Sequence, residues 1–141
     1  MTRARSKVRD ALSMGAGEVL VVREHAGREL AAMGGADVVL STTSDARAAG
    51  EVALGLRDEG RLVLLGLGEG PVPIDADALV NKQASVLGAM QDERADLVDL
   101  LELAARGEVR PWIEPYRLGQ AQRALMRAAE GRTRYRAVLI A

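Results

Sequence analysis

The sequence predicts an α/β fold in which about five mainly parallel strands form a sheet with flanking helices. Three observations carry this prediction. Short apolar runs alternate along the chain with segments of helical period. Each run is apolar on both faces of the pleat, which is typical of parallel strands that are covered on both sides. The length of 141 residues, with 48% hydrophobic and 28% charged residues, suits one globular domain.

The expected strands are the apolar runs of the sequence. They contain mostly Val, Leu, Ile, Met and Ala, because the chain has one Trp, two Tyr and no Phe. In chain order the expected strands are 18–22 (EVLVV), 36–41 (ADVVLS), 61–67 (RLVLLGL), 85–90 (SVLGAM) and 135–141 (YRAVLIA).

The expected helices fill the segments between these runs. The clearest is 92–106, where the first turn is acidic, as the helix dipole favours, and Gly107 ends the pattern. Its residues Leu97, Leu100, Leu101 and Ala104 share one face. The following RPWIEPYRL is expected to be an extended connection stiffened by its two prolines, with Trp112 and Tyr116 serving packing. The other expected helices are 6–14, 26–33, 45–58, 75–82 and 118–130.

Composition excludes several classes of function. A formal net charge of −1 gives no general attraction to nucleic acid or to an anionic membrane, and no apolar run has the length of a membrane span. The chain has no cysteine, which excludes disulfides and cysteine-based zinc sites within it and fits a cytoplasmic protein. His25 is the single histidine, and we interpret it as a solvated loop residue.

Five stretches follow one another along the chain: TRARSKVRDALSMGA, ADVVLSTTS, GRLVLLGLGEG, SVLGAM and the final LLELAARGEVRPWIEPYRLGQAQRALMRAAEGRTRYRAVLIA. Taken in this order, they resemble the C-terminal part of the coenzyme-binding domain of medium-chain zinc-type alcohol dehydrogenases. The NADP-preferring cinnamyl-alcohol-dehydrogenase branch is the most similar. The resemblance implies one partial Rossmann-like coenzyme-binding domain over 1–141.

The resemblance also implies which family parts this sequence does not contain. In the family a strand, a glycine-rich turn, a helix and a second strand precede the stretch that matches TRARSK. The fingerprint G-x-G-x-x-G, which holds a pyrophosphate at a helix N-terminus, is not in this sequence, and neither is the catalytic domain with its zinc ligands. GLGEG at 66–70 is followed by Pro71 and Pro73, so we interpret it as a plain turn.

Three groups of residues match family positions that contact the coenzyme. Thr2, Arg3, Ser6 and Lys7 match the loop at the adenosine ribose, where hydroxyls and cations without an acid suit the 2′-phosphate of NADP. The alternative is a frayed basic N-terminus in which Ser6 caps the first helix. Ser41 and Thr42 begin a run of hydroxyl residues at the carboxyl edge of the sheet, but Ser44 and Asp45 are equally ordinary helix N-caps.

The third group matches the nicotinamide and pyrophosphate contacts. Two strand ends match the backbone beside the nicotinamide ring, and the alternative for them is simple strand termination: Leu65, Gly66, Leu67, Gly88, Ala89 and Met90. Arg136 matches a pyrophosphate-binding arginine, since a guanidinium forks onto two phosphate oxygens. A salt bridge at the start of an apolar strand is the alternative for Arg136.

Two functions therefore stay open. The chain is either a fragment of a longer NAD(P)-dependent oxidoreductase, with weak or no NADP binding, no zinc and no catalysis alone, or a free-standing module for protein interaction or oligomerisation. In the family's sheet order the missing strands lie between 18–22 and 36–41. We expect the sheet to close by pairing these two segments, and the chain to form a homodimer through the far edge.

Overall fold

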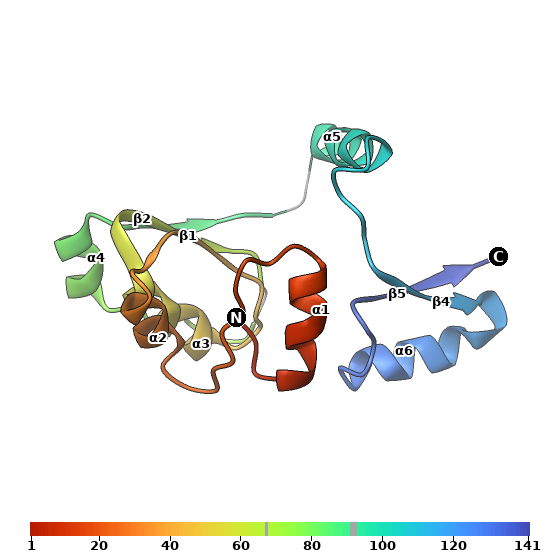
Figure 1. Ribbon diagram of the computed structural model, residues 1–141, viewed down its shortest axis with the longest axis horizontal. Helices are drawn as coiled ribbons and strands as arrows, with labels where there is room; N and C mark the ends of the chain where they lie inside the picture. The colour runs from red at the N-terminus through yellow and green to blue at the C-terminus, as the bar shows by residue number, and fades with distance from the viewer. Residues whose placement is uncertain (67, 91–92) are drawn as a thin grey trace. The chain divides into compact units, whose positions relative to one another are not determined.

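A computed structural model of the chain describes residues 1–66, 68–90 and 93–141 (Figure 1). The chain forms two compact units, residues 1–90 and residues 91–141. A single domain over 1–141 stays a prediction.

The first unit alternates helices and strands, as the sequence predicted. Its strands β1 and β3 match the expected runs 36–41 and 85–90, and its helices α2 and α4 match 26–33 and 75–82. The elements are η1 Arg5–Lys7, α1 Val8–Ser13, α2 Ala26–Ala32, β1 Ala36–Ser41, α3 Ala46–Glu51, η2 Val52–Gly55, β2 Leu56–Leu64, α4 Ala76–Lys82 and β3 Ser85–Gly88.

The three strands of this unit form a parallel sheet in the order β1-β2-β3. Alternating residues make its two faces different. Val39, Leu62 and Val86 are in register on one face, where Leu62 is fully buried at the centre of the core. Helix α2 and the turn η2 pack against this face, and Figure 1 shows α2 and α3 on the same side of the sheet. On the other face Leu40 is 65% exposed and Leu87 is 46% exposed.

Strand β2 begins earlier than the sequence predicted. The expected helix 45–58 ends in the structure at Gly55, where η2 passes into the strand. The pairing with β1 shifts register between Ala36 and Val38, and Glu59 adopts a left-handed φ of 60° within the same stretch. Residues 57–60 are polar or glycine and lack the alternation of apolar and polar residues that marks a strand. The sequence therefore did not predict this irregular start of β2.

The predicted strand 18–22 is wrong, and so is its pairing with β1. This segment is not a strand, and its Val21 forms a single parallel bridge with Thr2. The amide of Thr2 donates to the carbonyl of Leu20 at 2.9 Å, and the amide of Val22 donates to the carbonyl of Thr2 at 3.0 Å. The carbonyl of Leu20 and the amide of Val22 thus have hydrogen-bond partners in Thr2, so these two groups do not require pairing with β1. The edge of β1 away from β2 has no strand beside it among the described residues.

The second unit contains a helix and a small α/β motif: α5 Arg94–Ala105, β4 Ile113–Arg117, η3 Leu118–Gln120, α6 Ala121–Ala129 and β5 Arg136–Ile140. Strands β4 and β5 are parallel and pair over their full lengths. Helix α5 confirms the expected helix 92–106. The connection that was expected to be merely extended is strand β4. Among the described residues β4 has one strand neighbour, so one side of its backbone needs no ladder hydrogen bonds and Pro115 is tolerated there.

These elements confirm an α/β fold with parallel sheets and flanking helices. The described residues contain five strands, in sheets of three and two. In the first unit, parallel strands alternate with helices.

Candidate functional site

A cavity of about 950 Å³ lies at the carboxyl end of β1 in the first unit. The N-terminal residues 1–3 and the segment 22–26 form part of its wall, and the end of β1 with the loop after it forms another part. Residues of α3 and η2 line it as well. A volume of this size is within the range of small-molecule sites, about 300–1,000 Å³. The carboxyl edge of a parallel sheet is also where ligands of open α/β folds bind.

The N-terminal wall is held in place by backbone hydrogen bonds. Thr2 is bonded on both sides to the segment 20–22, and its hydroxyl accepts from the amide of Ala4 at 3.2 Å. The expectation of a frayed N-terminus is therefore wrong for Thr2. Ser6 does not cap the first helix either, since neither η1 nor α1 has a side-chain cap. Lys7 lines the cavity, whereas the exposed Ser6 is outside its lining.

The opposite wall is the loop after β1. The predicted residues Ser41 and Thr42 both line the cavity, together with Thr43. Ser41 is 7% exposed, and its carbonyl accepts from the amides of Leu65 and Gly66 at 2.9 and 3.0 Å. Thr42 is exposed. The structure thus brings Thr2, Arg3 and Lys7 together with two hydroxyl residues from a segment about forty positions away in the chain.

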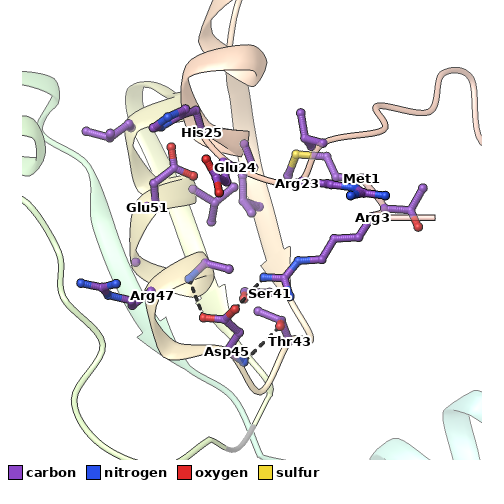
Figure 2. A pocket seen from close by; sticks show the side chains of 18 of the residues that line it. Met1, Arg3, Arg23, Glu24, His25, Ser41, Thr43, Asp45, Arg47 and Glu51 are labelled. Atoms are coloured by element: carbon purple, nitrogen blue, oxygen red, sulfur yellow. Dashed lines mark hydrogen bonds and ion pairs between the residues drawn. The ribbon is translucent and has the colours of Figure 1, made fainter. Parts of the chain in front are cut away.

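An ion pair joins the two walls, as Figure 2 shows (dashed line between Arg3 and Asp45). The guanidinium Nη2 of Arg3 donates to Oδ2 of Asp45 at 2.6 Å. Asp45 is also the N-cap of α3, where its Oδ1 accepts from the amide of Ala48 at 3.1 Å. The hydrogen bond from Arg3, followed by that from Ala48, lowers the pKa of the Asp45 carboxyl below its usual value, so the group is a carboxylate at neutral pH.

The N-cap role of Asp45 was predicted, but its contact with Arg3 was not. The two residues are separated by 42 positions, and no local pattern links them. The sequence did place Asp45 as an N-cap at the carboxyl edge of the sheet, where residues from neighbouring strand ends meet. This position was the available indication that Asp45 could contact another segment. The cavity also contains the predicted loop residue His25, which is exposed and adopts a left-handed φ of 61°.

The predicted nicotinamide contacts lie elsewhere. Leu65, Gly66, Ala89 and Met90 are outside the lining of this cavity. Gly66 packs on the chain itself, since a Cβ there would lie 2.1 Å from the carbonyl oxygen of Thr43. A Cβ on Gly88, in contrast, would meet no heavy atom within 4 Å. Leu67 lies outside the described residues.

Arg136 belongs to the second unit, where it is exposed and begins β5. Within this unit the predicted packing role is confirmed for Tyr116 but not for Trp112, which is 37% exposed. Tyr116 is 7% exposed and donates its hydroxyl to Glu114. Trp112 contacts Tyr135 edge-on at 5.6 Å between ring centroids, and the Arg134 guanidinium lies 5.1 Å from the Trp112 ring centroid.

Comparison with known proteins decides the family. The sequence profile of the family described as zinc-binding dehydrogenase matches residues 1–106. The chain belongs to the zinc-binding dehydrogenase family. The probable cinnamyl alcohol dehydrogenase 6 of Arabidopsis thaliana is 29% identical over 133 residues, which are 94% of this chain and 37% of the relative. The alcohol dehydrogenase of Geobacillus stearothermophilus is 30% identical over 107 residues, 76% of this chain and 32% of the relative.

Solved structures show the same fold. The alcohol dehydrogenase of Aeropyrum pernix matches 98% of this chain and 41% of its own with a TM-score of 0.87 at 23% identity. A cinnamyl alcohol dehydrogenase of Sorghum bicolor matches 98% of this chain and 40% of its own with a TM-score of 0.83 at 23% identity. The zinc-binding dehydrogenase chain therefore spans about a third to two-fifths of the length of these relatives.

The residues present do not fit a catalytic zinc ion. The sequence has no cysteine and one histidine. Among residues 1–66, 68–90 and 93–141, no group of three or more His, Cys, Asp or Glu side chains is arranged to hold a metal. Sites of this kind need three protein ligands, so no step of any reaction is assigned to zinc in this chain. Within the same described residues, no helix has the length and apolar character needed to span a membrane.

Proposed function

We propose that this alcohol dehydrogenase-like chain binds the adenosine end of NADP(H) in the cavity beside β1. The observation that carries the proposal is that two cations and three hydroxyl residues expected at the coenzyme all line one cavity. Arg3, Lys7 and Thr2 come from the N-terminal wall, and Ser41 and Thr42 come from the loop after β1. Sequence matching alone had assigned these two groups separately to the coenzyme.

The chemistry of these side chains suits a phosphorylated ribose. A guanidinium and an ammonium group both bind phosphate, the first through a planar fork and the second as a compact charge. Arg3 is 61% exposed, so its side chain can move to a ligand with little loss of packing. The hydroxyl groups of Thr2 and Thr42 donate to and accept from ribose oxygens. NADP rather than NAD is proposed because both N-terminal cations line the cavity.

Coenzyme binding by this chain alone is expected to be weak, and hydride transfer is not assigned to it. The dinucleotide fingerprint G-x-G-x-x-G would supply backbone donors to the pyrophosphate, and this sequence does not contain it. The coenzyme, when bound, supplies the hydride chemistry, whereas the residues described here hold and orient its adenosine end. Chemistry on a substrate is proposed to need the further parts that longer relatives possess.

Isothermal calorimetry of the 141-residue chain with NADPH tests this proposal. We expect binding in the micromolar range, weakened about tenfold by Arg3→Gln because a charge-assisted hydrogen bond to phosphate is lost. Arg5→Gln is the matched control, because Arg5 is two residues away, exposed and outside the cavity lining. No heat of binding with NADPH, or equal losses in both variants, would contradict the proposed site.

A second candidate function is a surface for self-association. It is favoured by the exposed face of the three-stranded sheet, where Leu40 of β1 is 65% exposed and Leu87 of β3 is 46% exposed. Parallel sheets are normally covered on both faces, and large exposed apolar patches often mark interaction sites. We propose a homodimer that forms through the outer edge of β3. Light scattering at micromolar concentrations is expected to give twice the chain mass of 15.0 kDa, and the single mass would contradict the dimer.

We also propose a cytoplasmic location. Its support is the absence of cysteine, which fits a reducing compartment. Fractionation of cells that express the tagged chain tests it, and recovery of the chain in a membrane or secreted fraction would contradict it.

A further inference from the structure

The N-terminal loop, residues 2–7, contains no acidic residue, but Asp45 from the loop after β1 adds a carboxylate to the same cavity. Thr2, Arg3, Ser6 and Lys7 contain no acid, and on that ground the sequence favours a 2′-phosphate over a 2′-hydroxyl. In the structure the carboxylate of Asp45 lies 2.6 Å from the guanidinium of Arg3 and lines the same cavity. The positive charge around Arg3 is therefore lower than the sequence of the N-terminal loop indicates.

The carboxylate of Asp45 is held more firmly than the guanidinium that it contacts. The backbone amide of Asp45 donates to the hydroxyl of Thr43 at 3.1 Å, and Oδ1 of Asp45 accepts from the amide of Ala48 at 3.1 Å. Its side chain is 39% exposed, whereas that of Arg3 is 61% exposed. Figure 2 shows Arg3 extended across the cavity toward Asp45. Asp45 thus has two hydrogen bonds within its own segment in addition to the ion pair, and Arg3 is the more exposed partner.

A nucleotide in this cavity meets both charges. A 2′-phosphate has to share the Arg3 guanidinium with Asp45, and it is repelled by the carboxylate. A free 2′-hydroxyl has no such conflict, because it can donate a hydrogen bond to the same carboxylate. An exposed ion pair is worth little to folding, so exchange of Arg3 from Asp45 to a phosphate costs little stability and mainly changes selectivity.

We infer that Asp45 is a specificity-determining residue of the proposed coenzyme site, which opposes the preference for a 2′-phosphate that Arg3 and Lys7 create. The inference rests on the proposed function. It assigns to one carboxylate, 42 residues away from Arg3, the role that an acid within the loop would otherwise have. Removal of this charge is expected to strengthen selectivity for the 2′-phosphate.

The variant Asp45→Asn removes the charge while keeping the cap. Asn is as good an N-cap as Asp, and its amide oxygen still accepts from Ala48. Asp75→Asn is the matched control. Asp75 lines the same cavity and caps α4 by accepting from the amides of Asp77 and Ala78 at 3.0 and 3.3 Å, without a contact to Arg3. Both substitutions change the net charge by the same amount.

The experiment compares two probes that differ only in the 2′-phosphate, adenosine 2′,5′-bisphosphate and 5′-AMP, by calorimetry on the 141-residue chain. The selectivity is the ratio of the Kd of 5′-AMP to that of the bisphosphate. We expect Asp45→Asn to raise this ratio about fivefold, as one partly exposed charge contact allows, and Asp75→Asn to change it less than twofold. Thermal unfolding of each variant verifies that the fold is kept.

The outcomes separate the two proposals. If both probes bind and the ratio is unchanged or lowered in Asp45→Asn, the role of Asp45 is overturned while the coenzyme site stands. Equal increases in Asp45→Asn and Asp75→Asn would also overturn that role, because they would indicate a general effect of charge. If neither probe binds the chain or any variant, the proposed function fails, and the inference fails with it.

Discussion

Two loops leave the same edge of the three-stranded sheet, and they differ in what they present. The loop after β1 presents polar side chains to the cavity, namely Ser41, Thr42, Thr43 and Asp45. The loop after β2 presents glycines to the first loop instead. A Cβ on Gly66 would lie 2.1 Å from the carbonyl oxygen of Thr43, and one on Gly68 would lie 2.2 Å from that of Ser44.

The difference shows that the second loop supports the first. The amides of Leu65 and Gly66 both donate to the carbonyl of Ser41, so the start of the second loop fixes the end of β1. The sequence matched Gly66 to a family position beside the nicotinamide ring. In this chain a packing contact accounts for that glycine without a ligand.

The largest effect is expected from Gly66→Ala. The added methyl group would overlap the backbone of Thr43, which cannot yield as a flexible side chain could. We expect a loss of about 2–3 kcal/mol in the free energy of unfolding, measured by urea denaturation. Gly88→Ala, at the end of the neighbouring strand β3, is the control, because its methyl group would meet nothing within 4 Å. Its expected effect is within about 0.5 kcal/mol. Equal effects of the two substitutions would contradict the supporting role of the second loop.

A smaller effect is expected from Thr43→Val. The substitution keeps the shape of the side chain but removes the hydroxyl that accepts from the amide of Asp45 at 3.1 Å. The expected loss is about 1 kcal/mol in the free energy of unfolding, the usual size of one such hydrogen bond. Thr42→Val serves for comparison, since Thr42 is exposed. A loss in Thr42→Val as large as that in Thr43→Val would show that the hydrogen bond does not order the loop.

The smallest effect concerns the titration of Asp45. Arg3 lowers the pKa of this carboxyl in the folded chain, so the contribution of the pair to stability is present above the unfolded pKa. It is lost as the pH falls through the folded pKa. In Arg3→Gln the pKa of Asp45 is expected to rise toward its usual value, as followed by carbon-detected NMR of the side-chain carboxyl. An unchanged pKa in Arg3→Gln would show that the ion pair does not persist in solution.

Much of the fold was predictable because its signals are local. The expected strand 36–41 has the same bounds as β1, and α4 differs from the expected 75–82 by one residue. The errors occurred where contacts between residues far apart in the sequence determine the secondary structure. Segment 18–22 has the composition of a strand, but Thr2 takes its hydrogen bonds. Strand β4 contains Pro115, which a pattern of alternation penalises but a strand with a single neighbour accepts.

The candidate site was predicted in its parts but not in its assembly. Thr2, Arg3, Lys7, Ser41 and Thr42 were all expected from the resemblance, and the structure groups them around one cavity. The contact of Arg3 with Asp45 was missed, because a sequence pattern within one loop contains no information about a side chain 42 residues away. The charge of a site depends on such contacts, and composition of a single loop is a poor guide to it.

The central claim is that a phosphorylated adenosine binds between the N-terminal wall and the loop after β1. Amide chemical-shift mapping of the isotope-labelled chain, titrated with adenosine 2′,5′-bisphosphate, tests this most directly. We expect saturable shifts at Thr2, Arg3, Lys7 and 41–45, with residues 93–141 unaffected. Absence of saturable shifts in the first unit, or shifts confined to 93–141, would contradict it.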